Sequence, residues 1–478
     1  MTTNKSMTKP RNILLLALTT LNLLAPGITS AEEAGKYPDP LLTTPGTPEV
    51  FQKGLEADGY SLGILAYTWG YSMVRMERVV REYVDVPSPK PATSYRAPLN
   101  QIGWARELAT PDAKDMPTAN NDTAYLSAVV TLTEPYVLTV PDTAGRYYVV
   151  NVFSMRHELE HYIGYRTTGT KAGKYVIVPP GWKGTLPADA TRLDVTTDKV
   201  WLWGRLFIAQ GESLDVIHKL QDQFTLAPLS GVVKAAALEA MPEIGNDPLG
   251  FLTHLGFAVK QNGVPSADEA LFAQLARIGL TKDGFDAAKL SEPTRKGLLR
   301  GLADAPAVVV SSMVTIASNR QGWTWATGLD NFGFTYPMRA LVAGPYLGGN
   351  GEREAMYATR YTDSENAPLT GANNYVIRFK QAPPVGAFWS LTIYNADDKM
   401  LVKNELNRFK LGGDTKGLKI LADGSFEVPI QHAKPTGDFA ANWLPSPEGG
   451  FYILLRLYIP SDAILSGEYQ LPQMERLK

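Results

Sequence analysis

The pentapeptide His157-Glu158-Leu159-Glu160-His161 has the residue types and the spacing of a metal site. On a helix, residues four apart lie on the same face, so the two imidazoles could bind one zinc ion. A carboxylate between them, with Glu158 as the first candidate, could act as the catalytic base that activates a metal-bound water. The pattern therefore raises the hypothesis of a metal-dependent hydrolase.

The residues around this pentapeptide weaken that hypothesis. The longer pattern His-Glu-x-x-His-x-x-Gly-x-x-His is matched as far as Gly164, but its third ligand position holds Thr167. The segment also follows an apolar run directly, which leaves little room for a long active-site helix. A polar turn or a short helix at a strand end is the structural alternative. A site for a divalent metal such as zinc, held by His157 and His161, stays open beside it.

A second chemically capable group lies upstream, in Asn120-Asn121-Asp122-Thr123-Ala124-Tyr125. Asn121, Asp122 and Tyr125, with Arg146 and Tyr148 from the next strand pair, offer hydrogen-bond donors, an acid and aromatic faces. Such mixtures suit the recognition of a hydroxylated or anionic small molecule. A buried Asp122 could also serve as a catalytic general base. The structural alternative is a turn or cap, since Asn and Asp bond readily to nearby backbone.

A third group lies near the C-terminus and contains Trp389 and Trp443, with Tyr394, Asn404, Asn442 and Arg456 close to them in the sequence. Tryptophan and tyrosine beside a strand usually belong to a core or to the edge of a sandwich. Stacking against a carbohydrate is the functional alternative, so both tryptophans are candidate ligand-binding residues.

The elements that position these groups follow from hydrophobic spacing. A buried helix is expected near residues 47–83. Short apolar runs separated by turns predict strands at 126–132, 136–140, 146–153, 175–178 and 200–208. Helical spacing follows at 213–224, 231–241, 248–261, 266–279 and 282–302, where Ser266 and Glu269 have the spacing of a capping box. Strands return at 374–379, 388–394, 425–429 and 451–458.

The strand regions resemble two bacterial families. Residues 120–125, 141–148, 162–164 and 166–169 resemble the N-terminal domain of unknown function 1254. Residues 383–384, 388–394, 442–445 and 456–458, with Asn404 and Asp423-Gly424, resemble its usual partner, domain 1214. The resemblance implies architecture and brings no established general activity.

The expected fold is mainly β with helical segments, an α+β multidomain chain with two jelly-roll-like β-sandwich domains linked by a helical region. The expected divisions are a signal peptide (1–31), a linker (32–50), an N-terminal helix plus β-sandwich (51–211), a helical bridging region (212–350) and a C-terminal β-sandwich (351–478).

The N-terminus predicts export. Lys5, Lys9 and Arg11 precede an apolar run that is too short to span a bilayer, and small residues end at Ala31. Cleavage there takes the formal net charge from −2 to −5. The absence of cysteine excludes disulfides, thiolate metal sites and cysteine nucleophiles. We expect a periplasmic or secreted protein without an integral membrane anchor after cleavage.

The sequence also limits the function. No basic tract is interleaved with aromatic residues, so nucleic-acid binding is not expected. The Gly-x-Ser-x-Gly elbow and the phosphate-binding loop are absent. The leading interpretation is an exported protein that binds or processes a small polar ligand or glycan near Asp122. The metal-dependent hydrolase and a structural module of the cell envelope are the alternatives, and self-association into a homo-oligomer is a further expectation.

Overall fold

The computed structural model describes residues 39–89, 95–113 and 117–477. The predicted signal peptide and the start of the predicted linker therefore lie outside the described residues. The chain forms two compact units, residues 1–54 and 55–478. The first contains α1 (Pro40–Thr43), whose N-cap Asp39 accepts a hydrogen bond from the Leu41 backbone N–H. The architecture below is that of residues 55–478.

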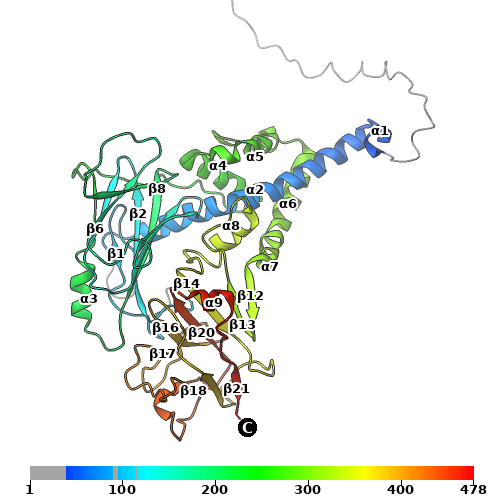
Figure 1. Cartoon of the computed structure of the whole chain (residues 1–478). Coiled ribbons are helices and arrows are strands. Elements are labelled where there is room, and N and C mark those ends of the chain that lie inside the picture. The colour runs from blue at the N-terminus through cyan, green and yellow to red at the C-terminus, as the bar shows by residue number, and fades with distance from the viewer. Residues whose placement is uncertain (1–38, 90–94, 114–116, 478) are drawn as a thin grey trace, which may run out of the picture. The chain divides into compact units, whose positions relative to one another are not determined.

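The first sandwich consists of two sheets (Figure 1). One has the order β1-β2-β8-β4-β5, and the other has the order β7-β6-β3-β9. Apolar side chains that alternate along the strands fill the space between them, with Leu126, Val150 and Leu202 among the residues fully removed from solvent. The strands are β1 (Gly103–Trp104), β2 (Thr123–Thr131), β3 (Tyr136–Val140), β4 (Tyr148–Ser154), β5 (Leu159–Gly164), β6 (Gly173–Val178), β7 (Ala190–Asp194), β8 (Lys199–Phe207) and β9 (Thr225–Pro228).

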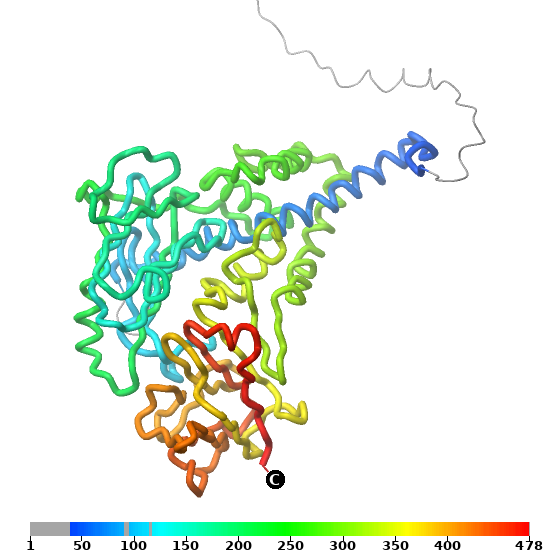
Figure 2. Tube along the Cα trace, in the orientation of Figure 1, coloured from blue at the N-terminus to red at the C-terminus, as the bar shows by residue number. Residues whose placement is uncertain are grey.

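The second sandwich is built in the same way, from sheets of order β12-β13-β14-β20-β16-β17 and β19-β18-β15-β21. Its core includes Leu391, Ile453 and Val428. Figure 2 shows the yellow-to-red part of the chain forming this sandwich. The strands are β12 (Ala317–Arg320), β13 (Trp323–Ala326), β14 (Ala355–Arg360), β15 (Tyr375–Phe379), β16 (Trp389–Asn395), β17 (Lys410–Gly412), β18 (Phe426–Gln431), β19 (Leu444–Pro445), β20 (Phe451–Tyr458) and β21 (Met474–Arg476).

Helices form the third part of this unit. The long α2 (Pro48–Val84) packs its C-terminal half on the outer face of the β8 sheet, through Met76, Val80 and Tyr83. Residues Leu62–Val74 of α2 pack against helices that follow the first sandwich. Those are α4 (Gly250–Asn262), α5 (Glu269–Leu275) and α6 (Glu292–Ser311), with α7 (Met313–Ile316) and α8 (Tyr336–Ala343) next in the chain; α3 (Leu214–Gln221) and α9 (Asp462–Ser466) belong to the sandwiches.

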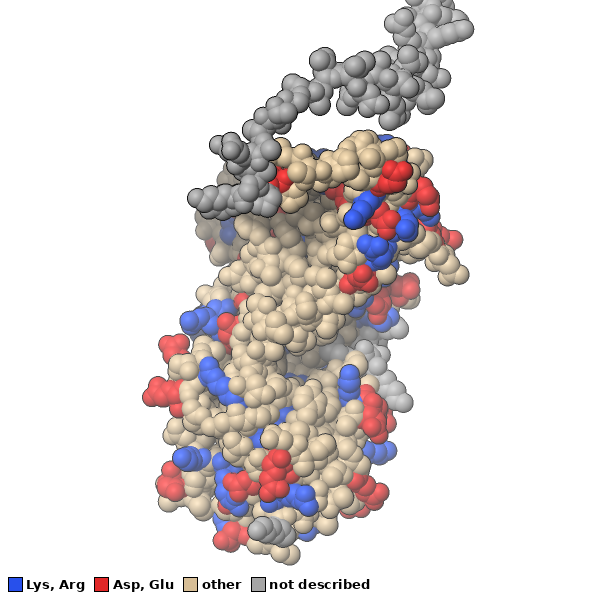
Figure 3. Space-filling view, turned by 90° about the vertical axis from the view of Figure 1, so that its right-hand side faces the viewer, with Lys and Arg blue, Asp and Glu red and all other residues tan. Residues whose placement is uncertain are grey.

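The α6–α7 segment presents an apolar face. Within the described residues, Glu292–Ile316 is the one helix long and apolar enough to cross a membrane, with a mean hydropathy of 1.3. Its buried side approaches α2 through Gly297 and Gly301, whereas Val310 and Val314 are exposed. Charged side chains are sparse over this part of the molecule in Figure 3.

The α+β multidomain class is confirmed, with 27% helix and 26% strand. The helix predicted at 47–83 and the strands predicted at 136–140 and 451–458 match α2, β3 and β20 closely. The jelly-roll connectivity stays a prediction. Two strand pairs, β6 with β7 and β18 with β19, are parallel.

Several local predictions were wrong. Residues 231–241 are irregular, and the predicted helix at 282–302 begins only at Glu292, because the two-stranded hairpin β10 (Leu280–Thr281) and β11 (Gly284–Phe285) comes first. Ser266 makes no side-chain cap, because Pro265 and the residues after it form a 3-10 turn. The second sandwich takes strands β12 and β13 from the predicted helical region 212–350, since Trp323 and Trp325 alternate into its core.

Candidate functional site

The two sandwiches meet through the outward faces of their central sheets. In β2, β8 and β4, every second residue points into the first core, and the others point away from it. Cross-strand pairing places Tyr125 beside Arg205 in one row of that outward face. The next row holds Ser127, Trp203 and Asn151. Because the strands keep this register, the first row pairs Tyr125 with Arg205 and the second pairs Asn151 with Trp203.

The facing sheet of the second sandwich offers a matching row. Tyr357 of β14 pairs with Arg456 of β20, which pairs with Ser390 of β16. Tyr458 follows on the same face of β20, two residues after Arg456. Direct hydrogen bonds join the two sheets, because Asn120 Nδ2 donates to the Tyr458 hydroxyl at 2.6 Å and the Ser390 hydroxyl donates to Asp122 Oδ2 at 2.6 Å.

These residues make one buried polar group, called the interface cluster below. Its members come from both sandwiches and from the loop before β14: Asn120, Asp122, Tyr125, Asn151, Arg205, Asn350, Tyr357, Ser390, Lys410, Arg456 and Tyr458. Asn350 connects the parts, because its Oδ1 accepts from Asn151 Nδ2 at 2.7 Å and its Nδ2 donates to the Tyr357 hydroxyl at 3.3 Å.

Asp122 is the carboxylate of the interface cluster, and it is fully removed from solvent. Lys410 Nζ lies 2.5 Å from its Oδ1 and 3.0 Å from an oxygen of Asp414. Burial lowers the pKa of Lys410, and the two carboxylates more than reverse this, so the net shift is upward. Asp122 is therefore held as a paired carboxylate and its charge is balanced within the protein.

Unlike Asp122, Arg205 and Arg456 have no ion-pair partner of opposite charge among the described residues. Arg205 is 7% exposed, and it donates to Gly348 O at 3.2 Å and to Asn350 Oδ1 at 3.4 Å. Arg456 is 2% exposed, and it donates to Thr392 Oγ1, Thr118 O and the Tyr394 hydroxyl. All of these acceptors are neutral. Neither guanidinium forms an ion pair with a carboxylate in the part of the chain that the structure describes.

Both guanidinium groups affect the pKa of the same two tyrosines, Tyr125 and Tyr458. Burial raises the pKa of Tyr125 and of Tyr458, and the positive charges of Arg205 and Arg456 partly oppose that rise at each hydroxyl. Tyr125 stacks on Trp203 with ring centres 4.9 Å apart. Tyr125 and Tyr357 keep part of their surface accessible, whereas Tyr458 has none. The cations therefore surround phenol groups that remain neutral and can donate or accept a hydrogen bond.

Two polar atoms, one in the interface cluster and one beside it, have no hydrogen-bond partner among the described residues. Asn151 Oδ1 and Trp203 Nε1 are both buried and make no hydrogen bond. They lie in the same row of the sheet. An unpaired buried acceptor or donor costs about 1–3 kcal/mol, so a bound group that pairs with them would recover free energy.

Of the predicted ligand-binding residues, the structure places Asp122 and Tyr125 in this cluster. Asn121 lies next to it and donates to Ala109 O at 2.5 Å. Arg146 lies elsewhere and pairs with Glu212, while Tyr148 belongs to the first sandwich core. Trp389 belongs to the second core, and Trp443 donates its indole N–H to Gln431 O at 2.8 Å.

In the pentapeptide of the metal hypothesis, His157 and Glu158 follow a turn, and Leu159, Glu160 and His161 belong to β5. His157 has a positive φ of 61°, is fully buried, stacks on Phe153 and accepts the Gly348 backbone N–H at its Nε2. Burial and nearby arginines lower the pKa of His157 to about 3. His161 instead donates from Nε2 to Asp194 O at 2.7 Å. Glu158 bonds to the buried Arg339 at 3.0 Å.

The two imidazoles thus bond to different parts of the chain, His157 to the loop at Gly348 and His161 to β7. Within the described ranges, no group of three or more His, Asp or Glu side chains is placed to hold a metal ion. Each residue of the pentapeptide already has a protein partner. The zinc hypothesis stays a prediction. It requires His157 Nε2 to lose its hydrogen bond from the Gly348 backbone N–H.

Several members of the cluster were not predicted as ligand residues from the sequence: Arg205, Asn350, Tyr357 and Lys410. Arg205 carried a usable signal, because it is the one charged residue between Val200 and Ile208 in an otherwise apolar strand. A charge in such a strand needs a partner or a function. Asn350 and Lys410 lie in loop-like sequence, where no comparable signal exists.

Comparisons with known proteins agree with this two-part architecture. The family model described as protein of unknown function (DUF1254) matches residues 99–228, and that of DUF1214 matches residues 354–462. The crystal structure of the VPA0106 protein from Vibrio parahaemolyticus is similar, with 27% identity and a TM-score of 0.69 over 88% of this chain and 100% of that one. A putative uncharacterized protein from Burkholderia cenocepacia aligns at 12% identity over 91% of each chain, with a TM-score of 0.41. No curated protein matches the sequence.

Proposed function

The chain is a protein with an N-terminal DUF1254 domain and a C-terminal DUF1214 domain, and from that premise we propose that it binds a small hydroxylated anion in the interface cluster. A sugar acid or another hydroxy acid is the ligand class. The observation that carries the proposal is the pair Arg205 and Arg456, two buried guanidinium groups whose acceptors among the described residues are all neutral.

The charge balance around the cluster supports an anionic ligand. Asp122 is paired with Lys410, and Glu354 is paired with Arg166 at 2.5 Å. Asp414 also pairs with Lys410, so three carboxylates face four cations, and one positive charge is left in excess among the described residues. A buried unpaired charge is costly, and a carboxylate is the group that guanidinium binds with the best geometry.

The neutral groups support a ligand that carries hydroxyls. Tyrosine hydroxyls and asparagine amides can each donate and accept, which matches the mixed demands of a sugar hydroxyl. Tyr125 and Tyr357 are partly accessible, and Asn151 Oδ1 has a free acceptor site. A few polar groups that converge from several strands are typical of a small-molecule site.

Export is a further part of this proposal, because the predicted signal peptide ends at Ala31. N-terminal sequencing of the protein from the cell envelope or the medium tests it, and a retained leader in a cytoplasmic fraction would contradict it. In a periplasmic or secreted setting the ligand would be met outside the cytoplasm. The metal-dependent hydrolase and the envelope module remain alternatives that the measurements below separate.

A matched set of ligands tests the binding proposal. D-glucuronate, D-galacturonate and D-gluconate would be titrated calorimetrically beside glucose and galactose, which lack the carboxylate. We expect at least one acid to bind and its neutral counterpart to bind much more weakly. Arg205→Met should weaken that binding by about 30-fold or more. Arg192→Met, which changes an exposed arginine of β7 paired with Asp194, should leave it unchanged.

Two results would contradict the proposal. One is the absence of binding by all three acids. The other is binding that Arg205→Met and Tyr125→Phe leave unchanged, because the ligand would then lie elsewhere.

A further inference from the structure

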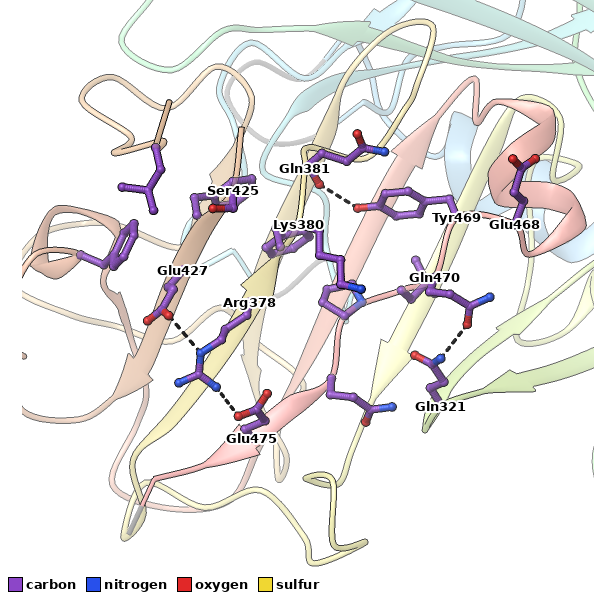
Figure 4. A pocket seen from close by; sticks show the side chains of 17 residues that line it. Gln321, Arg378, Lys380, Gln381, Ser425, Glu427, Glu468, Tyr469, Gln470 and Glu475 are labelled. Atoms are coloured by element: carbon purple, nitrogen blue, oxygen red, sulfur yellow. Dashed lines mark hydrogen bonds and ion pairs between the residues drawn. The ribbon is translucent and has the colours of Figure 1, made fainter. Parts of the chain in front are cut away.

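A separate pocket lies on the outward face of the β15 sheet, in the second sandwich. It encloses about 740 Å³, within the range of roughly 300–1,000 Å³ that small-molecule sites occupy. Figure 4 shows side chains of β15, β18 and β21 on one side and those of the 468–470 segment and Gln321 on the other. None of its lining residues belongs to the interface cluster.

Strand alternation explains why this face is polar. Tyr375, Ile377 and Phe379 of β15 point into the core, so Arg378 and then Lys380 point outward. Arg378 pairs across the sheet with Glu427 of β18. Its guanidinium bonds to Glu427 at 2.9 Å on one side and to Glu475 of β21 on the other. Three strands thus present a fixed row of alternating charge to the pocket.

The pocket carries little net charge. Glu427 and Glu475 neutralise Arg378, and Lys380 has no ion-pair partner among the described residues. Glu468, on the opposite wall, carries a compensating negative charge. Acidic and basic groups therefore nearly balance, which does not favour a strongly charged ligand.

The remaining lining groups are amides, a phenol and apolar surface. Gln321 Nε2 donates to Gln470 Oε1 at 2.6 Å, and the Tyr469 hydroxyl donates to Gln381 O at 3.0 Å (Figure 4). Phe439 is half-buried and Leu421 is exposed at the other side of the pocket. Planar groups that donate and accept, beside a half-buried aromatic ring, suit sugar hydroxyls and the apolar faces of sugar rings.

We infer that this pocket binds a neutral oligosaccharide chain. β15 itself offers no free backbone edge, because it pairs with β18 on one side and β21 on the other, so a peptide strand could add to this sheet only beyond β21 or β19. The site is independent of the interface cluster, and either can exist without the other.

Calorimetry and saturation-transfer NMR of the full chain with maltohexaose and with cellohexaose test this inference. We expect one of the two to bind with a micromolar to millimolar Kd. Phe439→Ala and Gln470→Ala should each weaken that binding, by about tenfold for the aromatic ring. Lys434→Ala, an exposed change outside the pocket, and Arg205→Met should leave it unchanged.

Three outcomes would overturn the inference. The first is that neither hexaose binds at millimolar concentration. The second is that binding survives both pocket variants. The third is that binding is lost in Arg205→Met and kept in Phe439→Ala. The last result would assign the saccharide to the interface cluster. Unchanged melting temperatures of the pocket variants would show that any loss of binding is local.

Discussion

Replacing Arg205 by methionine separates a ligand-binding role from a structural one. The guanidinium is buried and makes two hydrogen bonds to the described residues, of 3.2 and 3.4 Å, both to neutral acceptors. Its ring contacts with Tyr125 and Trp203 are 5.7 and 5.9 Å to the ring centres. These long contacts are worth about 2–3 kcal/mol together at most.

The opposing effect is the removal of a buried, unpaired charge. Its desolvation costs several kcal/mol, and methionine of similar length fills the same space without that cost. We therefore expect the melting temperature of the free protein to stay the same or rise in Arg205→Met. Binding of a carboxylate should fall, by about 30-fold or more, because a buried charge-assisted pair is worth roughly 2–5 kcal/mol.

Arg456→Met is the matched comparison. Arg456 makes three hydrogen bonds of 2.7, 2.9 and 3.1 Å that join β20 to β16 and to Thr118. Its loss should lower the melting temperature by several degrees as well as weaken binding. Differential scanning calorimetry and titration with D-glucuronate give both readouts. An equal drop in melting temperature in both variants, with unchanged affinity in Arg205→Met, would refute this account of Arg205.

Other parts of the structure lead to four further predictions. Asp122→Ala should destabilise the chain by about 3 kcal/mol in urea unfolding, the low end for a broken buried pair, because Lys410 keeps Asp414. Burial lowers the pKa of His157 to about 3, so below pH 6.5 the unfolded chain binds a proton that the folded chain does not. As pH falls from 6.5, the wild type should therefore lose up to about 1.4 kcal/mol per pH unit more than His157→Gln in urea unfolding, and parallel curves would contradict this. Gly301→Ala should lower the melting temperature, because its Cβ would lie 2.3 Å from Tyr60 O on α2. Elemental analysis should find well under one zinc per purified chain, and stoichiometric zinc lost in His161→Ala would revive the hydrolase.

The sequence predicted the elements whose burial is periodic. The 37-residue helix α2 and strands β3 and β20 carry their apolar residues at the spacing that their surroundings require. Residues 231–241 have good helix formers and yet form no helix. Val232 and Val233 are exposed there and only Leu238 of the segment packs on the cluster around Met76, so the segment buries too little apolar surface to stabilise a helix.

The candidate site was only partly predictable, because it forms where distant strands meet. Asp122 and Tyr125 could be chosen from their local mixture of polar and aromatic types. Their partners are far away in sequence, and Asp122 and Ser390 are 268 residues apart. No local pattern reports such a contact.

Strand parity would have improved the choice among the C-terminal residues. In β20, Phe451, Ile453, Leu455 and Leu457 fill the core, so Arg456 and Tyr458 must point the other way. The same alternation in β16 sends Trp389 into the core and Ser390 out of it. The spacing in β16 alone therefore predicts that Trp389 is a core residue.

Burial cannot separate these two faces, because every residue of β20 is buried. A strand of this kind normally lies in a sheet covered on both sides by apolar groups, and its sequence is then apolar throughout. Here one face is apolar and the other holds Arg456 and Tyr458. The second face is covered by a partner that is itself polar, and buried polar groups are retained only where they bond to one another or to a ligand. Neither Arg205 nor Arg456 forms an ion pair among the described residues, and the anion that we propose as ligand would supply a carboxylate to them.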